Sequence, residues 1–242
     1  STLESNSNHT DVLSGNAEFD DDIFENCTSS DFGGAINFRS DGILAIHDID
    51  FRSCSSSSGK GGVVYVIGNG EHKLSEISFR DCSTSGQLNA EGGSMYIEGG
   101  TNTLKDVDFK SSKVAITIKN EDSISKGGAL VAVGWLSGSM LDEVDFRDCS
   151  AGIGGAIYLD SAASRVEIVD SNFRNNAASI DGGGAIYVRD TTLIHLNDVK
   201  FINSSSIGII TGNDLHFSEL GVSADNINMT QIQQDVVTKS KS

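Results

Sequence analysis

Residues 154–176 read GGAIYLDSAASRVEIVDSNFRNN, and this stretch contains two elements that return along most of the chain. One is a pair of glycines followed by small or aliphatic residues, and the other is a phenylalanine that closes a short alternating segment. The phenylalanines return at intervals of 27, 28, 30, 37, 27 and 28 residues, at Phe24, Phe51, Phe79, Phe109, Phe146, Phe173 and Phe201. The glycine pairs begin at Gly33, Gly61, Gly92, Gly127, Gly154 and Gly183. Two marks that repeat in phase predict a solenoid.

Each repeat contains short segments with the alternation of a β-strand. Aliphatic residues stand five and two positions before the phenylalanine in most turns, as Leu104 and Val107 do before Phe109. The spacing of two places both side chains on one strand face, and the spacing of five requires a bend between two short strands. A further strand follows each glycine pair, as in Ile157-Tyr158-Leu159, where the tyrosine faces away from its neighbours. No stretch has a helical period of useful length.

Stacking equivalent strands of successive turns pairs the backbone of each turn with the turns above and below. The sequence therefore predicts an all-β fold, a right-handed parallel β-helix of about seven turns over residues 17–220, with the glycine pairs at sharp corners. We expect residues 1–16 to form an N-terminal cap or extension and residues 221–242 a C-terminal cap or tail, because strand edges need cover. The 37-residue interval, which includes Trp135, predicts an extra strand or loop that protrudes.

Composition limits the partners and the location. The chain has 242 residues and a formal net charge of −17, which argues against nucleic acid and anionic lipid as partners. No run of 18 apolar residues occurs, so we expect no membrane insertion by this segment. The chain begins at Ser1 without a methionine or a signal region, so we expect a processed product or a part of a longer protein. We expect a secreted, extracellular or cell-surface protein, with glycosylation sequons at Asn8, Asn26, Asn203 and Asn228.

The two repeat elements resemble those of the chlamydial polymorphic outer membrane proteins. A Gly-Gly-Ala-Ile element stands at residues 33–36, 154–157 and 183–186, and an F-x-x-N element stands at residues 173–176. The resemblance covers about residues 17–217. It implies a β-helical passenger domain that is displayed on a cell surface and acts in adhesion. Similar repeats occur in other extracellular proteins of the pectin-lyase-like superfold.

Four cysteines stand three residues after a repeat phenylalanine, where that family has asparagine: Cys27, Cys54, Cys82 and Cys149. This position predicts an internal column of buried thiols that form no disulfide. Cα atoms on adjacent turns lie about 4.8 Å apart, within disulfide range, so at most one pair among Cys27, Cys54 and Cys82 can close. Cys149 is too far away, because the turn of Ser112 intervenes. No cysteine or histidine spacing fits zinc, and we predict no metal ligands.

Charged residues flank the phenylalanine in several turns: Arg52, Arg80, Lys110, Arg147 and Arg174 after it, and Asp50, Asp108 and Asp145 before it. Such columns are usually a solvated face on which opposite charges pair. A calcium site that uses Asp20, Asp21 and Asp22 or the aspartate column stays open, because hard cations bind several oxygens. A catalytic face also stays open, because polysaccharide lyases and hydrolases of this superfold use acids and an Arg or Lys base there. Against catalysis, the charges repeat on many turns.

Every tyrosine of the chain takes the same outward position after a glycine pair, at Tyr65, Tyr96, Tyr158 and Tyr187. We expect these residues and Trp135 to bind a protein or a glycan at a cell surface or in an extracellular assembly, because tyrosine offers apolar area with a polar tip. Simple ladder packing is the alternative. Ice binding would need outward threonine rows, and none appears.

The sequence therefore predicts a non-enzymatic, secreted or cell-surface β-helix that acts in adhesion or as a structural element of an extracellular assembly. The alternative is a polysaccharide lyase or hydrolase of the pectin-lyase-like superfold. We predict no cofactor other than a possible calcium ion.

Overall fold

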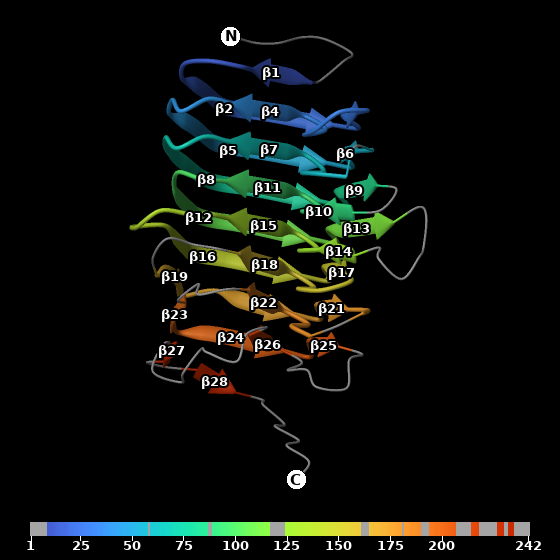
Figure 1. Cartoon of the computed structure of the whole chain (residues 1–242), viewed down its shortest axis with the longest axis vertical. Coiled ribbons are helices and arrows are strands. Elements are labelled where there is room, and N and C mark those ends of the chain that lie inside the picture. Colours follow the sequence, from blue (N-terminus) through green and yellow to red (C-terminus); the bar gives the residue numbers. More distant parts are fainter. Residues whose placement is uncertain are drawn as a thin grey trace.

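The computed structural model describes residues 9–57, 59–86, 89–116, 124–160, 165–180, 182–189, 194–206, 214–217, 227–229 and 232–234. These residues contain β-strands and no helix, and the paired strands run parallel. The strands stack as successive turns of a coil (Figure 1). The predicted all-β parallel β-helix is therefore confirmed.

Three long sheets form the walls of the coil. Sheet A follows the glycine pairs and contains β1 (Thr10–Val12), β4 (Ile36–Arg39), β7 (Val64–Ile67), β11 (Met95–Glu98), β15 (Leu130–Val133), β18 (Ile157–Asp160), β22 (Ile186–Arg189) and β26 (Leu215–Phe217). Sheet B carries the phenylalanines and contains β2 (Ala17–Glu25), β5 (Leu44–Arg52), β8 (Glu71–Arg80), β12 (Thr101–Lys110), β16 (Met140–Arg147), β19 (Val166–Val169), β20 (Asn172–Arg174), β23 (Ile194–Asn197), β24 (Val199–Ile202), β27 (Ile227–Met229) and β28 (Ile232–Gln234). Sheet C follows the cysteine column and contains β3 (Thr28–Ser29), β6 (Ser55–Ser56), β9 (Ser83–Gly86), β13 (Lys113–Ile116), β17 (Ser150–Ala151), β21 (Ala177–Ala178) and β25 (Ser205–Ser206).

The bend predicted before each phenylalanine is present in sheet B, at an acidic residue. The residue three positions before the phenylalanine has a φ between 48° and 55° in all seven turns, at Asp21, Asp48, Glu76, Asp106, Glu143, Asp170 and Asp198. This left-handed conformation is tolerated best by residues such as aspartate. The bend turns the strand while the aliphatic residue and the phenylalanine both keep facing inward.

The glycine pairs make corners at which the backbones of adjacent turns nearly touch. Gly154 has a φ of 59°. A Cβ atom on Gly155 would lie 2.1 Å from the carbonyl oxygen of Gly184 on the next turn. A larger residue would therefore push two turns apart, which explains why the pair recurs.

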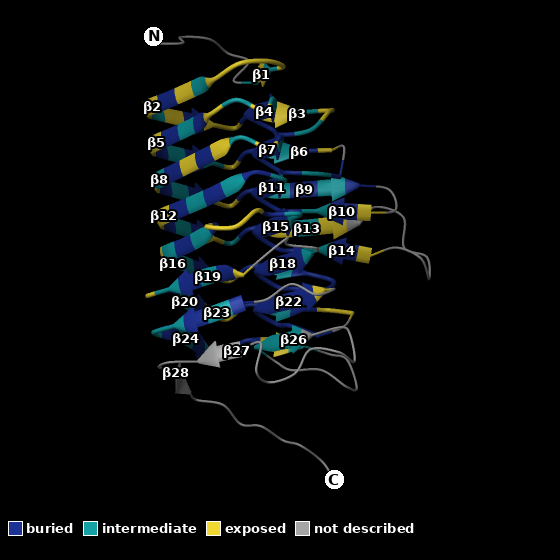
Figure 2. Ribbon diagram, turned by 60° about the vertical axis from the view of Figure 1, so that its left-hand side comes forward, coloured by how far each residue is buried: buried dark blue, intermediate teal, exposed yellow. Residues whose placement is uncertain are grey.

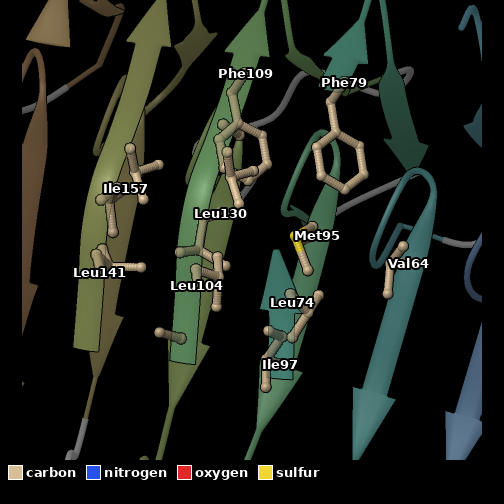
Figure 3. Packing of buried hydrophobic residues seen from close by; sticks show 14 of the residues in the cluster. Val64, Leu74, Phe79, Met95, Ile97, Leu104, Phe109, Leu130, Leu141 and Ile157 are labelled. Atoms are coloured by element: carbon tan, nitrogen blue, oxygen red, sulfur yellow. The ribbon is translucent and has the colours of Figure 1, made fainter. Parts of the chain in front are cut away.

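The interior of the coil is filled by columns of equivalent side chains. Buried positions alternate with more exposed ones along β8 and β12 (Figure 2). The seven repeat phenylalanines stack in one file, with ring centroids of Phe79 and Phe109 4.8 Å apart and their planes within 3° (Figure 3). All four cysteines are buried and none forms a disulfide. The predicted internal columns of rings and thiols are therefore confirmed.

The variation in repeat length falls on one side of the coil. From each glycine pair to the next phenylalanine the chain takes 17 to 19 residues, whereas the return segment takes 8 to 18. The two longest return segments form β10 (Asn89–Glu91) and β14 (Ile124–Lys126), which pair with each other. The extra strand expected in the 37-residue interval is β14. It precedes the glycine pair that begins at Gly127, whereas Trp135 follows that pair.

The sheets cross both predicted domain boundaries. β1 pairs with β4 before residue 17, and β27 and β28 pair with β23 and β24 after residue 220. The cap assignments for residues 1–16 and 221–242 stay predictions, since many of these residues lie outside the described ranges. Within the described ranges, no helix is long and apolar enough to cross a membrane.

Candidate functional site

The four tyrosines lie on the outer face of sheet A and form a small second core. With Val131 they make what we call the tyrosine strip, which is separate from the main core inside the coil. The rings of Tyr65 and Tyr96 stack with centroids 5.3 Å apart, and those of Tyr158 and Tyr187 stack 5.4 Å apart. Val131 interrupts the rings between them. The strip is thus a stack held in register by the strands beneath it.

Residues from the return segments cover the strip. The residue just before a glycine pair reaches the tyrosine of the following turn, and Phe32 stacks on Tyr65 with ring centroids 4.6 Å apart. The ammonium of Lys60 lies 4.3 Å from the ring centroid of Tyr96, and that of Lys126 lies 5.0 Å from the centroid of Tyr158. Cation–π attraction of this kind strengthens when the groups are partly desolvated.

An ion-pair ladder joins the two covering lysines. Glu91, which precedes the next glycine pair, lies 3.4 Å from the ammonium of Lys60 and 2.8 Å from that of Lys126. The side chain of Glu91 is only 12% exposed. The Lys60–Glu91–Lys126 ladder therefore closes the middle of the tyrosine strip.

The tyrosine hydroxyls bond to charged groups at the edge of the strip. Tyr96 donates to Glu98 at 2.9 Å and accepts from Lys60 at 3.1 Å. Tyr158 donates to Asp160 at 3.3 Å. Burial raises the pKa of Tyr96 and of Tyr158, and the carboxylates of Glu98 and Asp160 raise them further. These hydroxyls stay protonated well above the range of an ordinary tyrosine.

The four tyrosines take the predicted outward position on sheet A, but they are not exposed. They are 2% to 8% exposed, because the residues before the glycine pairs fold over them. The alternation of charge along Lys60, Glu91 and Lys126 was the available signal for this cover. Binding of a partner through Tyr65, Tyr96, Tyr158 and Tyr187 stays a prediction, and it requires the cover to open.

Trp135 is also not exposed, and it belongs to the main core. It is 1% exposed, and its indole N–H donates to the carbonyl oxygen of Ile97 at 3.2 Å. The extra residues of its interval lie before Gly127, so Trp135 is in a segment of ordinary length. The prediction that the insertion holds Trp135 is therefore wrong, and binding of a partner through Trp135 stays a prediction.

A groove of about 440 Å³ lies along the bend of sheet B and spans four turns. We call it the acidic groove. Its floor includes Ile49 and Ile77, and Ile23 at one end is 61% exposed. Seven carboxylates and one guanidinium line it, from Asp21, Asp22, Asp48, Asp50, Glu76, Asp106, Asp108 and Arg80. Of the predicted charged face, Asp50, Asp108 and Arg80 line this groove.

Two carboxylates in the acidic groove have pKa values moved in opposite directions. Burial alone would raise the pKa of Asp50, but the hydrogen bond from Arg52 and the charges of Arg52 and Arg80 hold it below its usual value. Burial raises the pKa of Asp108, and the charge of Arg147, 3.6 Å away, only partly offsets this. Asp50 and Asp108 are two turns apart, about 10 Å along the coil.

The structure places the remaining predicted sites as follows. Asn26 and Asn203 are exposed at the left-handed corner after their phenylalanines, Asn8 lies outside the described residues, and only the strand position of Asn228 is described. Within the described ranges, no three His, Cys, Asp or Glu side chains are placed to hold a metal ion. Calcium binding at Asp20, Asp21 and Asp22 or along the aspartate column stays a prediction.

No known protein family matches the chain, and no solved structure matches it. The chain is similar to the probable autotransporter YfaL of Escherichia coli (strain K12), with 27% identity over 126 residues. The aligned region covers 49% of this chain and 10% of that protein, so the chain spans about a tenth of its relative. This similarity to a probable autotransporter is consistent with the parallel β-helix of the chain, and the likeness to the chlamydial repeats stays a resemblance.

Proposed function

We propose that this chain is a β-helical part of a secreted or cell-surface protein, and that it acts without catalysis in adhesion or as a structural element of an extracellular assembly. The similarity to a probable autotransporter supports the location. The observation that carries the role is the acidic groove, in which negatively charged side chains recur on four successive turns. A surface that repeats turn by turn suits an extended partner more than a single small substrate.

The charges of the groove define the chemistry of that partner. The bend carboxylates Asp48, Glu76 and Asp106 are exposed and stacked, whereas Asp50 is neutralised by Arg52 and Arg80. Like charges stacked in register repel one another, so a ligand that brings positive charge relieves the repulsion. The partner is therefore a basic or cation-bridged protein or glycan segment.

Binding to arrays of glycans and of extracellular matrix proteins tests this role. We expect the purified chain to bind basic members of the arrays, and the triple variant Asp48→Asn, Glu76→Gln and Asp106→Asn to bind at least tenfold more weakly. Asp81→Asn with Asp148→Asn is the matched control, because these residues are exposed, acidic and left-handed at the other corner. Equal loss in the control, or no binding to any array, would contradict the proposal.

The second candidate is a polysaccharide lyase or hydrolase, and one observation favours it. Asp50 stays ionised while Asp108 holds its proton more tightly, and both line one groove with Arg80. Carboxylates whose pKa values move apart are the arrangement that a general base and a general acid need.

Incubation with acidic polysaccharides, with and without calcium, tests the enzymatic candidate. Unsaturated products absorbing in the ultraviolet would indicate a lyase, and new reducing ends a hydrolase. Activity lost in Asp108→Asn and kept in Asp81→Asn would place the chemistry in the groove. If no product forms with any polysaccharide of the set, the candidate is wrong.

A further inference from the structure

Cys27 and Cys54 occupy the same position on adjacent turns. The residues that follow them, Thr28 and Ser55, are paired in register between β3 and β6. Their Cα atoms therefore lie about one strand spacing apart, close to 4.8 Å. This separation is within the range that a disulfide bridges.

The thiol of Cys54 is directed toward the turn of Cys27. Its Sγ lies 3.4 Å from the carbonyl oxygen of Phe24, on the first turn, and 3.4 Å from that of Arg52 on its own turn. The side chain of Cys27 also interacts with this thiol. The thiol of Cys82 makes a longer contact of 3.8 Å to the carbonyl oxygen of Phe51, and the side chain that interacts with it is Ser94. Among these cysteines, Cys54 is therefore the one whose thiol approaches the preceding turn most closely.

The pKa of Cys54 is also held lower than those of Cys82 and Cys149. Its hydrogen bond with Cys27 lowers the pKa of Cys54 in spite of burial, whereas burial raises the pKa of Cys82 and of Cys149 to about 12. The thiolate is the nucleophile in disulfide exchange. Cys54 is thus the attacking residue, and Cys27 is placed to resolve the product.

We propose that Cys27 and Cys54 form a thiol–disulfide site that closes when the chain meets a low-molecular-weight disulfide such as oxidised glutathione. The Cys54 thiolate attacks one sulfur of the oxidant, forms a mixed disulfide and releases one glutathione thiolate. The Cys27 thiolate then attacks Sγ of Cys54, forms the protein disulfide and releases the second glutathione. Two protein thiols are oxidised, and the two electrons and two protons pass to the oxidant. This inference rests on the proposed extracellular location only because an oxidising compartment supplies the disulfide oxidant.

The pair lies at one end of the stack of turns. This position gives the oxidant access to the thiols, and a bridge there would stabilise the terminal turn. Both sulfur atoms are buried, so the turn must open for the attack. β3 has two residues, and within the described part of the chain it pairs only with β6. Such an edge turn opens more easily than the interior of a stack. Once closed, the bridge holds the first turn on the second.

Two matched double variants test the choice of partners. Cys82→Ser with Cys149→Ser keeps Cys27 and Cys54, whereas Cys27→Ser with Cys149→Ser keeps Cys54 and Cys82. Serine is tolerated here, because Ser112 and Ser204 occupy the same column in other turns.

Both variants are treated with oxidised glutathione, and mass and thiol content are measured after denaturation. We expect the first to lose both thiols and about 2 Da, and the second to keep its thiols or to carry glutathione. Equal closure in both variants, or two remaining thiols in the first, would overturn the proposal.

The unaltered chain provides a test that does not depend on the folding of any variant. After oxidation, alkylation and digestion, peptide mapping should find Cys27 linked to Cys54, with Cys82 and Cys149 alkylated. Amide hydrogen exchange in residues 17–29 should slow by about tenfold and recover with dithiothreitol. A bridge between any other two cysteines, or unchanged exchange in a bridged chain, would contradict the inference.

Discussion

The two aromatic files of this molecule show what a β-helix requires on the inside and on the outside of its wall. The phenylalanine file lies inside sheet B and runs unbroken through seven turns, with ring centroids 4.8 to 5.1 Å apart. The tyrosine strip lies outside sheet A, is interrupted at Val131, and stacks more loosely at 5.3 and 5.4 Å. The coil closes around the first file, whereas the second depends on side chains that fold over it.

Stacking in register does not by itself decide whether a file of rings is buried. The phenylalanines are covered by the opposite walls of the coil and pack among other buried apolar side chains. The tyrosines are covered by Phe32 and the Lys60–Glu91–Lys126 ladder, and their hydroxyls bond to carboxylates. The stability of the first file therefore comes from apolar packing, and that of the second from packing combined with charge.

Removing one ring from the inner file is expected to have the largest effect. Phe109→Ala leaves a cavity between two stacked rings in a closed core, and the free energy of unfolding should fall by about 3–5 kcal/mol. Phe32→Ala removes a half-buried ring from the outer cover and should cost about 1–2 kcal/mol. Chemical denaturation followed by far-ultraviolet circular dichroism measures both. Equal losses would show that the two files do not differ as described.

The sequence predicted the inner file far better than the outer one. Glycine pairs and phenylalanines return at fixed separations in a segment of nearly constant length, so stacking, the bend and the thiol column follow from the period. The cover over Tyr96 and Tyr158 comes from return segments of variable length, where no period indicates which residue folds back. The predicted columns of charge contained Asp50, Asp108 and Arg80 of the acidic groove but not its bend carboxylates. The hollow depends on left-handed residues such as Glu76, whose conformation the residue type does not indicate.

Alkaline pH should weaken the outer strip and leave the inner file unaffected. Because the pKa values of Tyr65, Tyr96 and Tyr158 are raised above the unfolded value near 10, stability is complete below about pH 10. It falls as pH rises further, by at most about 1.4 kcal/mol per pH unit for each tyrosine that stays protonated. Unfolding between pH 9 and about 11.5, with absorbance at about 295 nm to detect tyrosinate, measures this.

Tyr96→Phe with Tyr158→Phe separates the tyrosines from other alkaline titrations. The double variant should show a shallower loss of stability above pH 10, since its phenylalanines do not ionise. A slope equal to that of the unaltered chain would assign the alkaline effect to lysines or to the backbone.

Removing a single hydroxyl from the tyrosine strip should have a smaller effect on the free energy of unfolding at neutral pH. Tyr96→Phe keeps the ring but leaves Glu98 without its donor and Lys60 without its acceptor. The free energy of unfolding should fall by about 1.5–3 kcal/mol, as expected for hydrogen bonds to charged groups. Tyr187→Phe is the control, because its hydroxyl makes no hydrogen bond within the described part of the structure. Comparable losses in the two variants would mean that the ring, and not its bonds, holds the strip.

Breaking the ion-pair ladder should give the smallest loss of stability and the clearest increase in the accessibility of the tyrosine rings. Glu91→Gln breaks the pairs with Lys60 and Lys126 and should cost about 0.5–1 kcal/mol, less in high salt. Glu71→Gln removes an exposed pair with Lys73 at 2.9 Å and should cost less. Nitration of tyrosine by tetranitromethane, mapped by mass spectrometry, should be faster at Tyr96 and Tyr158 in the Glu91 variant only. If nitration is unchanged, the ladder does not control the cover, and the difference between the two files reduces to packing alone.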